Sequence, residues 1–311
     1  MRVLWLAAVL GCTSAGAAPL AFITNQNDDT VSVIDTAVGS VIETLTVGSK
    51  PAGVAVCPGS DRVYISNPDS RDLSVINADS LTVTGTVPVG EGPLAIVCGH
   101  QDERVYVADW YENVVRVLDP TGKLIATVAV GASPSGLVLS SDDRYLYVTN
   151  RDDNTLSAID TTTWTVIGQA ATGDRPFGVT LDRAGQRLYV ANVRSNDVTV
   201  IAVDELAVIA TVPVGERPYA GALALEDSRL LVTDQYDETV SVIDTETLEV
   251  IATIEVGEYP EGIDTHPDDR HVYVANWFSN TVSVIDAQTL EVIDTIDTGD
   301  GSRAYGEFIG R

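Results

Sequence analysis

A short motif recurs along almost the whole chain at a nearly constant spacing. It consists of an aromatic or large aliphatic residue, an aliphatic residue, a small residue and then Asn or Asp, and a proline mark keeps the same period. A fixed period of about 40 residues is typical of repeat folds, in which each copy forms one structural unit. Successive motifs lie 41 or 42 residues apart and begin at Phe22, Tyr64, Tyr106, Tyr147, Tyr189, Leu231 and Tyr273, and the prolines are Pro51, Pro93, Pro134, Pro176, Pro218 and Pro260.

Each repeat contains four short β-strand signals. In the copy that begins at Pro134, runs rich in β-branched and aromatic residues cover 136–139, 144–149, 155–159 and 165–171, with Asn, Asp, Gly and Pro between them. No segment keeps a 3.6-residue period, so we expect no substantial helix. Four antiparallel strands in about 42 residues correspond to one propeller blade. The sequence therefore predicts an all-β, seven-bladed β-propeller with four antiparallel strands per blade.

The phase of the repeat indicates how the ring closes. The chain enters the repeat at a second strand, residues 20–24, and ends with an unpartnered first-strand signal over 303–309. We expect this C-terminal strand to join the N-terminal blade as its inner strand, because closure removes the exposed edges of an open array. Residues 18–311 are then one seven-bladed domain.

The motif is intact at Tyr147-Val148-Thr149-Asn150, and Asn-Thr-x-Ser-x-Ile-Asp and Val-Gly-x-x-Pro follow it. It resembles the YVTN β-propeller repeat, and the whole chain after its leader resembles the YncE-like secreted seven-bladed proteins. The resemblance implies a propeller. It does not imply one function, since related propellers serve as binding scaffolds, surface-layer units and parts of quinoprotein enzymes.

The first residues, 1–17, are predicted to be a signal peptide. A basic start precedes an apolar run over 3–12, which is too short to span a bilayer, and Ala15-x-Ala17 fits a signal-peptidase site. The alternative is lipoprotein processing and anchoring at Cys12. Both predict export to the periplasm or the medium, and no later stretch could span a membrane.

Two cysteines remain after the leader, Cys57 and Cys98, at nearly equivalent places in neighbouring repeats. In an oxidising compartment they could form a disulfide. Two unrelated buried thiols are the alternative.

The charge excludes some partners. Acidic residues number 45 against 18 basic ones, so the formal net charge is −27. Nucleic acids and anionic membranes attract proteins through Lys and Arg, so neither is an expected partner.

Deviations from the repeat point to one face. Loops that join second to third strands, and outer strands to the next inner strand, open on the same face of a propeller. Aromatic residues make up only 6% of the chain, yet aromatic and Arg residues concentrate in these loops, and such residues dominate binding hot spots. The alternative is that they only cap the core. The candidates are Trp110, Tyr111, Arg151, Arg175, Phe177, Arg194, Arg217, Tyr219, Tyr236, Tyr259, Trp277, Phe278 and Arg303.

Acidic residues follow the repeated glycine in five of seven copies, which predicts a ring of carboxylates round the channel mouth. Such oxygens suit Ca²⁺, although solvated charge is the commoner explanation. The weak metal candidates are Glu216, Glu258 and Asp300. In the third repeat Arg116 replaces a Ser or Thr, and we expect Asp109 or Glu112 to pair with it.

The three histidines, His100, His266 and His271, fall on the opposite face, in or beside turns that join first and second strands. Neither a zinc-type spacing nor a triad context appears, so no metal site or catalytic residue is predicted there. No phosphate-binding glycine motif, CxxC pair or heme-attachment sequence appears either, and no cofactor is expected.

The leading hypothesis is an exported, non-enzymatic and monomeric propeller that docks a periplasmic protein, peptide or glycan on its loop face. The second is an enzyme of the lactonase or quinoprotein type that uses the carboxylates of Glu216, Glu258 or Glu261, with or without a metal. The third is a surface-layer unit, which a self-closing ring makes less favourable. The sequence leans against an enzyme because no nucleophile–base pair stands out.

Overall fold

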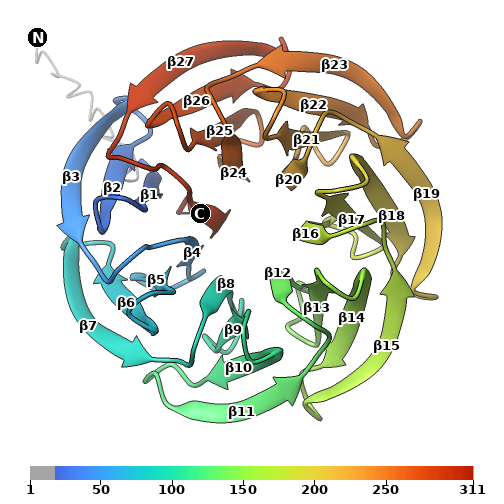
Figure 1. Cartoon of the computed structure of the whole chain (residues 1–311). Coiled ribbons are helices and arrows are strands. Elements are labelled where there is room, and N and C mark those ends of the chain that lie inside the picture. The colour runs from blue at the N-terminus through green and yellow to red at the C-terminus, as the bar shows by residue number, and fades with distance from the viewer. Residues whose placement is uncertain (1–17, 311) are drawn as a thin grey trace, which may run out of the picture.

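The computed structural model describes residues 18–310, and seven β-sheets surround a central axis in it (Figure 1). The predicted leader, 1–17 with Cys12, lies outside the described residues. Blade 1 contains β1 (Leu20–Asn25), β2 (Thr30–Asp35) and β3 (Ser40–Thr46). Blade 2 contains β4 (Gly53–Val56), β5 (Arg62–Asn67), β6 (Asp72–Asn77) and β7 (Thr82–Pro88). Blade 3 contains β8 (Pro93–Cys98), β9 (Val105–Asp109), β10 (Val114–Leu118) and β11 (Leu124–Ala129).

The remaining blades repeat this order. Blade 4 contains β12 (Pro134–Leu139), β13 (Tyr145–Asn150), β14 (Thr155–Asp160) and β15 (Thr165–Ala171). Blade 5 contains β16 (Pro176–Leu181), β17 (Arg187–Asn192), β18 (Asp197–Ala202) and β19 (Ala207–Pro213). Blade 6 contains β20 (Pro218–Ala224), β21 (Arg229–Asp234), β22 (Thr239–Asp244) and β23 (Glu249–Glu255). Blade 7 contains β24 (Pro260–Thr265), β25 (His271–Asn276), β26 (Thr281–Asp286) and β27 (Glu291–Asp297), and β28 (Tyr305–Glu307) follows it.

The predicted all-β, seven-bladed propeller is thus confirmed, and within each blade sequential strands pair antiparallel. Second and third strands are buried on both faces because each sheet packs between two others, whereas outer strands such as β15 are mostly exposed. No helix in the described part of the chain has the length and apolar character needed to cross a membrane.

The C-terminal segment closes the ring as expected, with one difference in its pairing. Single antiparallel bridges at its two ends, Asn25↔Ser302 and Ala21↔Ile309, join it to β1. Between them β28 pairs parallel with β4 of blade 2, so the segment lies between the first two blades (Figure 1). Gly306 allows this path: its φ is 118°, and a Cβ there would stand 2.4 Å from the Val54 carbonyl oxygen.

Buried side-chain hydrogen bonds tie the strands of each blade together at the end of the second strand. In blade 4 the Asn150 amide donates to Ser157 Oγ at 2.9 Å and to Thr155 Oγ1 at 3.0 Å, and its Oδ1 accepts the Gly131 N–H at 3.0 Å. The Asp after the third strand forms the predicted Asx-turn: Asp160 Oδ1 accepts the Thr162 N–H at 2.8 Å. Both repeated residues therefore serve the architecture.

Two further predictions concern blades 2 and 3. Cys57 and Cys98 form a disulfide with a Cα–Cα distance of 5.2 Å, which links the residue that follows β4 to the last residue of β8. Arg116 contacts Glu112, and its Nη2 lies 3.6 Å from Asp109 Oδ2, so the expected ion pair is present.

Candidate functional site

Three aromatic rings meet across the channel at its loop-face end. Phe177 stacks on Tyr219 with ring centroids 4.1 Å apart, and Tyr305 meets their edges at 5.1 and 5.6 Å. They come from β16, β20 and β28, and all three are buried. This plug closes the mouth around which the sequence placed a binding surface. For Phe177 and Tyr219, capping of the core is therefore the role that the geometry shows.

A buried ion pair braces the plug. Arg303 Nη2 donates to Tyr219 Oη at 2.6 Å, and Arg303 Nε lies 2.7 Å from Glu261 Oε2. Gln235 Nε2 donates to Glu261 Oε1 at 2.9 Å. Burial works against charge on Arg303, but the Glu261 carboxylate together with Tyr219 and Tyr305 outweighs it and raises the pKa of the guanidinium. Glu261 and Arg303 thus hold the plug together and do not face an open mouth.

A second aromatic group lies on the loops of blades 6 and 7 and reaches the surface. This aromatic cluster consists of Tyr236, Tyr259, Trp277 and Phe278. Tyr259 is central, with its ring centroid 5.7 Å from Tyr236, 5.4 Å from Trp277 and 5.0 Å from Phe278. Phe278 is 60% exposed and Tyr236 is 48% exposed, so large apolar rings face water here.

Charged loop residues flank the aromatic cluster. The Arg217 guanidinium lies 4.0 Å from the centroid of the Tyr236 ring. The Glu216 carbonyl accepts the Tyr236 N–H and the Glu258 carbonyl accepts the Phe278 N–H, both at 3.2 Å, so each exposed ring adjoins a glutamate-bearing loop. Both glutamates are exposed, and neither forms an ion pair within residues 18–310.

The other predicted residues form a smaller patch on blades 3–5. Arg151 covers the Trp110 ring at 5.3 Å, and Tyr111 beside them is 71% exposed. Arg175 and Arg194 are exposed on adjoining loops, since the Val193 N–H is donated to the Arg175 carbonyl at 2.9 Å. The loop face therefore divides into a buried plug and two exposed aromatic patches, which sequence reasoning had treated as one set.

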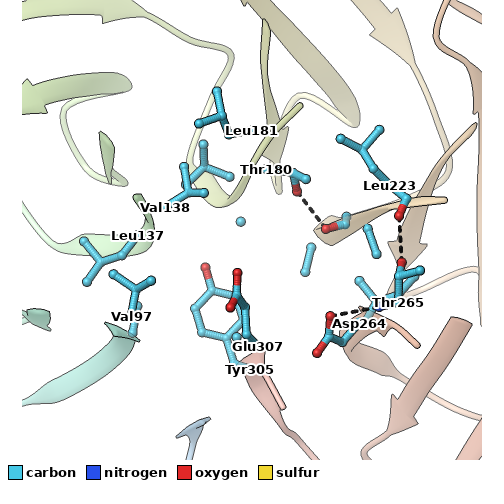
Figure 2. A pocket seen from close by; sticks show the side chains of 18 of the residues that line it. Val97, Leu137, Val138, Thr180, Leu181, Leu223, Asp264, Thr265, Tyr305 and Glu307 are labelled. Carbon is cyan, nitrogen blue, oxygen red and sulfur yellow. Dashed lines mark hydrogen bonds between the residues drawn. The ribbon is translucent and has the colours of Figure 1, made fainter. Parts of the chain in front are cut away.

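Below the plug the channel contains a cavity of about 500 Å³ (Figure 2). Its wall is mainly aliphatic, from side chains such as Val97, Leu137, Val138, Leu181 and Leu223. Most polar wall groups already have structural partners: Thr180 Oγ1 donates to the Gly221 carbonyl at 2.7 Å, and Thr265 Oγ1 to the Leu223 carbonyl at 2.8 Å. Asp264 Oδ2 accepts the N–H groups of Phe308 and Ile309, both at 2.9 Å.

The cavity extends toward the turns that join first and second strands, because residues of those turns line it. Arg183 contacts Asp269, and its Nε lies 3.2 Å from Asp227 Oδ1. His266 and Pro267 also belong to the lining. Charged and titratable side chains thus line the cavity at the end of the channel opposite the predicted binding face.

The β24–β25 turn brings His266, Asp268 and His271 together, and the sequence interpretation missed this. Asp268 Oδ2 lies 2.6 Å from His271 Nδ1 and 3.0 Å from His266 Nδ1. One ligand atom from each lies within 4.8 Å of the others, and residues 18–310 contain no other such group of three His, Cys, Asp or Glu. This arrangement could hold a metal ion, whereas the sequence spacing had predicted no metal site here. Glu216, Glu258 and Asp300 form no such group.

The sequence pattern that could have indicated this group is the spacing His-x-Asp-x-x-His across a hairpin turn. The pattern becomes informative once the backbones of residues 266 and 271 are known to be hydrogen-bonded to each other. The His266 N–H donates to the His271 carbonyl at 2.8 Å. Burial works against charge on Asp268, but hydrogen bonds from the backbone and ring of His271 hold its pKa well below the ordinary value.

Comparisons with known proteins agree with the fold. The lactonase seven-bladed β-propeller model matches residues 123–208, and the cytochrome d1 heme domain model matches residues 184–304. Each model covers less than half of the chain, so the two matches agree with the propeller fold and do not assign the chain to either family. No curated protein matches the chain.

Two solved structures share the architecture. Kuenenia stuttgartiensis hydrazine synthase is 20% identical with a TM-score of 0.78, and the alignment covers 85% of this chain and 91% of that one. Dihydro-heme d1 dehydrogenase NirN in complex with DHE is 13% identical with a TM-score of 0.69, covering 94% and 74%. At these identities the likeness concerns the fold alone.

The cavity does not offer a heme an unobstructed axial ligand. His266 is the one histidine in its lining; its Nε2 contacts Thr36 Oγ1 at 3.2 Å, and the Asp268 carboxylate lies 3.0 Å from Nδ1, where a heme iron would have to stand. The Tyr305 hydroxyl donates to the Phe177 carbonyl at 3.4 Å. The residues that line the cavity therefore do not fit a coordinated heme, and no heme chemistry is assigned to this chain.

Proposed function

We propose that this protein is an exported, non-enzymatic binding propeller that docks a basic protein partner on its loop face. The observation that supports the proposal is the aromatic cluster, whose rings Tyr236 and Phe278 are exposed between the loops of Glu216 and Glu258. Aromatic side chains on a rigid scaffold are typical binding hot spots. The sequence hypothesis allowed a protein, a peptide or a glycan as the ligand, and the charge of this surface favours a protein.

Charge favours a partner that presents Lys or Arg. A cation over an aromatic ring gains attraction from the ring's electron density, and a nearby carboxylate adds to it. Because Arg217 already covers the Tyr236 ring, the exposed Phe278 ring is the one that such a cation would meet. Glu216 and Glu258 provide such carboxylates without an ion pair within residues 18–310, and the chain as a whole carries −27. A negative surface also speeds the approach of a positive partner.

Site-specific photo-crosslinking tests the proposal. A photoreactive phenylalanine analogue replaces Phe278 in one variant and Ile251 in the control, since Ile251 is 44% exposed on outer strand β23, away from the loops. In periplasmic extract we expect one basic protein to be captured from position 278 and not from 251. Capture should fall with added salt and with Glu216→Gln plus Glu258→Gln. Equal capture at both positions, or capture that ignores salt and both glutamates, would contradict the proposal.

A lactonase-type enzyme is the second candidate, and the match of residues 123–208 to the lactonase model favours it. Of the three carboxylates considered for such chemistry, Glu261 is buried against Arg303, which leaves Glu216 and Glu258. Hydrolysis of a sugar-acid δ-lactone, followed in a pH-stat, tests this candidate. Turnover by the wild type that disappears in Glu216→Gln or Glu258→Gln would favour the enzyme over the binding protein.

A further inference from the structure

We propose that His266, Asp268 and His271 form a binding site for a divalent first-row transition ion, with Zn²⁺ as the expected ligand. The inference is independent of the proposed partner docking, because the site lies on the opposite face of the propeller. Two imidazoles and one carboxylate are a common ligand set for zinc, and three protein ligands leave a fourth position for water.

The hairpin turn prearranges the ligands. The backbone bond between His266 and His271 fixes both at the base of the turn, and Asp268 lies between them. Asp268 Oδ1 accepts the N–H groups of Arg270 at 2.9 Å and His271 at 3.0 Å, which orients the carboxylate. The other carboxylate oxygen, Oδ2, then faces the two rings, 2.6 Å from His271 Nδ1 and 3.0 Å from His266 Nδ1.

These distances are close to those of an occupied site. Ligand atoms about 2.0–2.1 Å from a tetrahedral zinc stand roughly 3.3 Å apart. The two carboxylate–imidazole distances need to open by less than 1 Å to reach that spacing. The ligand nitrogens of the two rings lie within 4.8 Å of each other, and movements of this size are within reach of partly exposed side chains at a turn.

The second observation is the hydrogen bonding of His266. The Thr36 hydroxyl donates to the Pro19 carbonyl at 2.7 Å, so toward His266 its oxygen can only accept. It therefore accepts the proton of His266 Nε2, at 3.2 Å. The Asp268 N–H points at Nδ1 from 3.2 Å, which also identifies Nδ1 as an acceptor.

His266 Nδ1 also lies 3.0 Å from the Asp268 carboxylate oxygen Oδ2. A metal ion between these two atoms would be coordinated by both, in place of the 3.2 Å contact with the Asp268 N–H. A ring nitrogen that donates to a fixed oxygen while the other faces the ion is the usual arrangement around metal-bound histidine. Thr36, from the neighbouring blade 1, thus acts as a positioning residue for the site.

Metal titration tests the proposal. The full chain is stripped with EDTA and titrated with Zn²⁺ against a chromophoric chelator, in millimolar Mg²⁺ that occupies weak carboxylate sites. We expect one Zn²⁺ per chain and at least tenfold weaker binding in His266→Ala and in His271→Ala. Thr36→Val, which removes the acceptor for Nε2, should weaken binding about 10–100-fold. His100→Ala, which changes the third histidine in blade 3, should bind like the wild type.

Substitution with Co²⁺ gives a spectroscopic readout, since a four-coordinate site produces strong visible absorption that each His variant should lose. Circular dichroism without metal verifies folding, and His271→Asn replaces the alanine variant if that variant does not fold. The proposal is overturned if the wild type binds no Zn²⁺ under these conditions. It is equally overturned if folded His266 and His271 variants bind as tightly as His100→Ala.

Discussion

Replacing Asp234 with asparagine should stabilise the protein, and more strongly at higher pH. Five blades have a buried Asn at this position, but blade 6 has Asp234, which is fully buried and forms no ion pair with a residue of 18–310. Ser241 Oγ donates to Asp234 Oδ2 at 2.7 Å and Thr239 Oγ1 at 3.3 Å. These bonds favour the carboxylate only in part, and burial raises the pKa of Asp234 from 3.8 to about 7.

The size of the stabilisation follows from the difference between the pKa of Asp234 in the folded protein and its pKa in the unfolded chain. Below pH 4 Asp234 is protonated in both the folded and the unfolded chain, so it has no net effect. Between about pH 4 and pH 7 the unfolded chain releases the proton while the folded protein retains it, so stability falls as the pH rises. The loss is complete above pH 7, and a difference of about three pH units in pKa corresponds to about 4 kcal/mol. Asparagine escapes it, because its amide can donate to Ser241 and Thr239.

The assay is denaturant unfolding of the wild type and Asp234→Asn at several values between pH 4 and pH 8. All other titrating groups are shared, so the difference between the two free energies of unfolding isolates this carboxyl group. The matched control is Asn276→Asp in blade 7, whose Asn276 amide donates to Ser283 at 2.9 Å and Thr281 at 3.1 Å. Asn276→Asp should make the variant progressively less stable than the wild type as the pH rises, whereas Asp234→Asn should become progressively more stable than the wild type. A constant difference between wild type and Asp234→Asn across this range would refute the reasoning.

Two further predictions concern stability. Removing the disulfide with Cys57→Ala and Cys98→Ala should lower the free energy of unfolding by about 4 kcal/mol, since the bond closes a loop of 41 residues. Chemical unfolding under oxidising conditions measures this free energy, and a decrease of less than about 1 kcal/mol would contradict the prediction. Arg116→Ser should destabilise by about 3–5 kcal/mol because it leaves Asp109 buried without its cation. Adding Asp109→Asn should restore most of the loss by recreating the polar cluster of other blades, and a double variant no better than the single one would argue against the pairing.

Much of the fold could be predicted because a repeat imposes the same local choices seven times. The constant spacing of the Tyr-Val-Thr-Asn motif predicts the number of blades, and the repeated Asn and Asp residues indicate where side chains hydrogen-bond within each blade. The pairing of the C-terminal strand was harder, because it depends on one backbone angle at Gly306 and on the Asp264 carboxylate that holds residues 308 and 309.

The site was predicted less completely, because the two positions beside the repeated proline have different surroundings. Phe177 and Tyr219 directly follow the proline and lie in the channel plug, whereas Tyr259 precedes Pro260 and supports an exposed cluster. The plug could not be predicted from these loops alone, because its third ring, Tyr305, comes from the C-terminal strand. The histidine group escaped notice because its spacing matches no zinc motif until the hairpin ladder is known.

The affinity of the captured partner tests the central claim most directly. Its dissociation constant is measured for the wild type, for the Tyr236→Ala/Phe278→Ala double variant and for Ile251→Ala as control. Loss of two central aromatic anchors, each contributing about 2 kcal/mol or more, should weaken binding at least 100-fold, whereas Ile251→Ala should leave it unchanged. If the double variant binds the partner as tightly as the wild type does, the aromatic cluster is not the docking site.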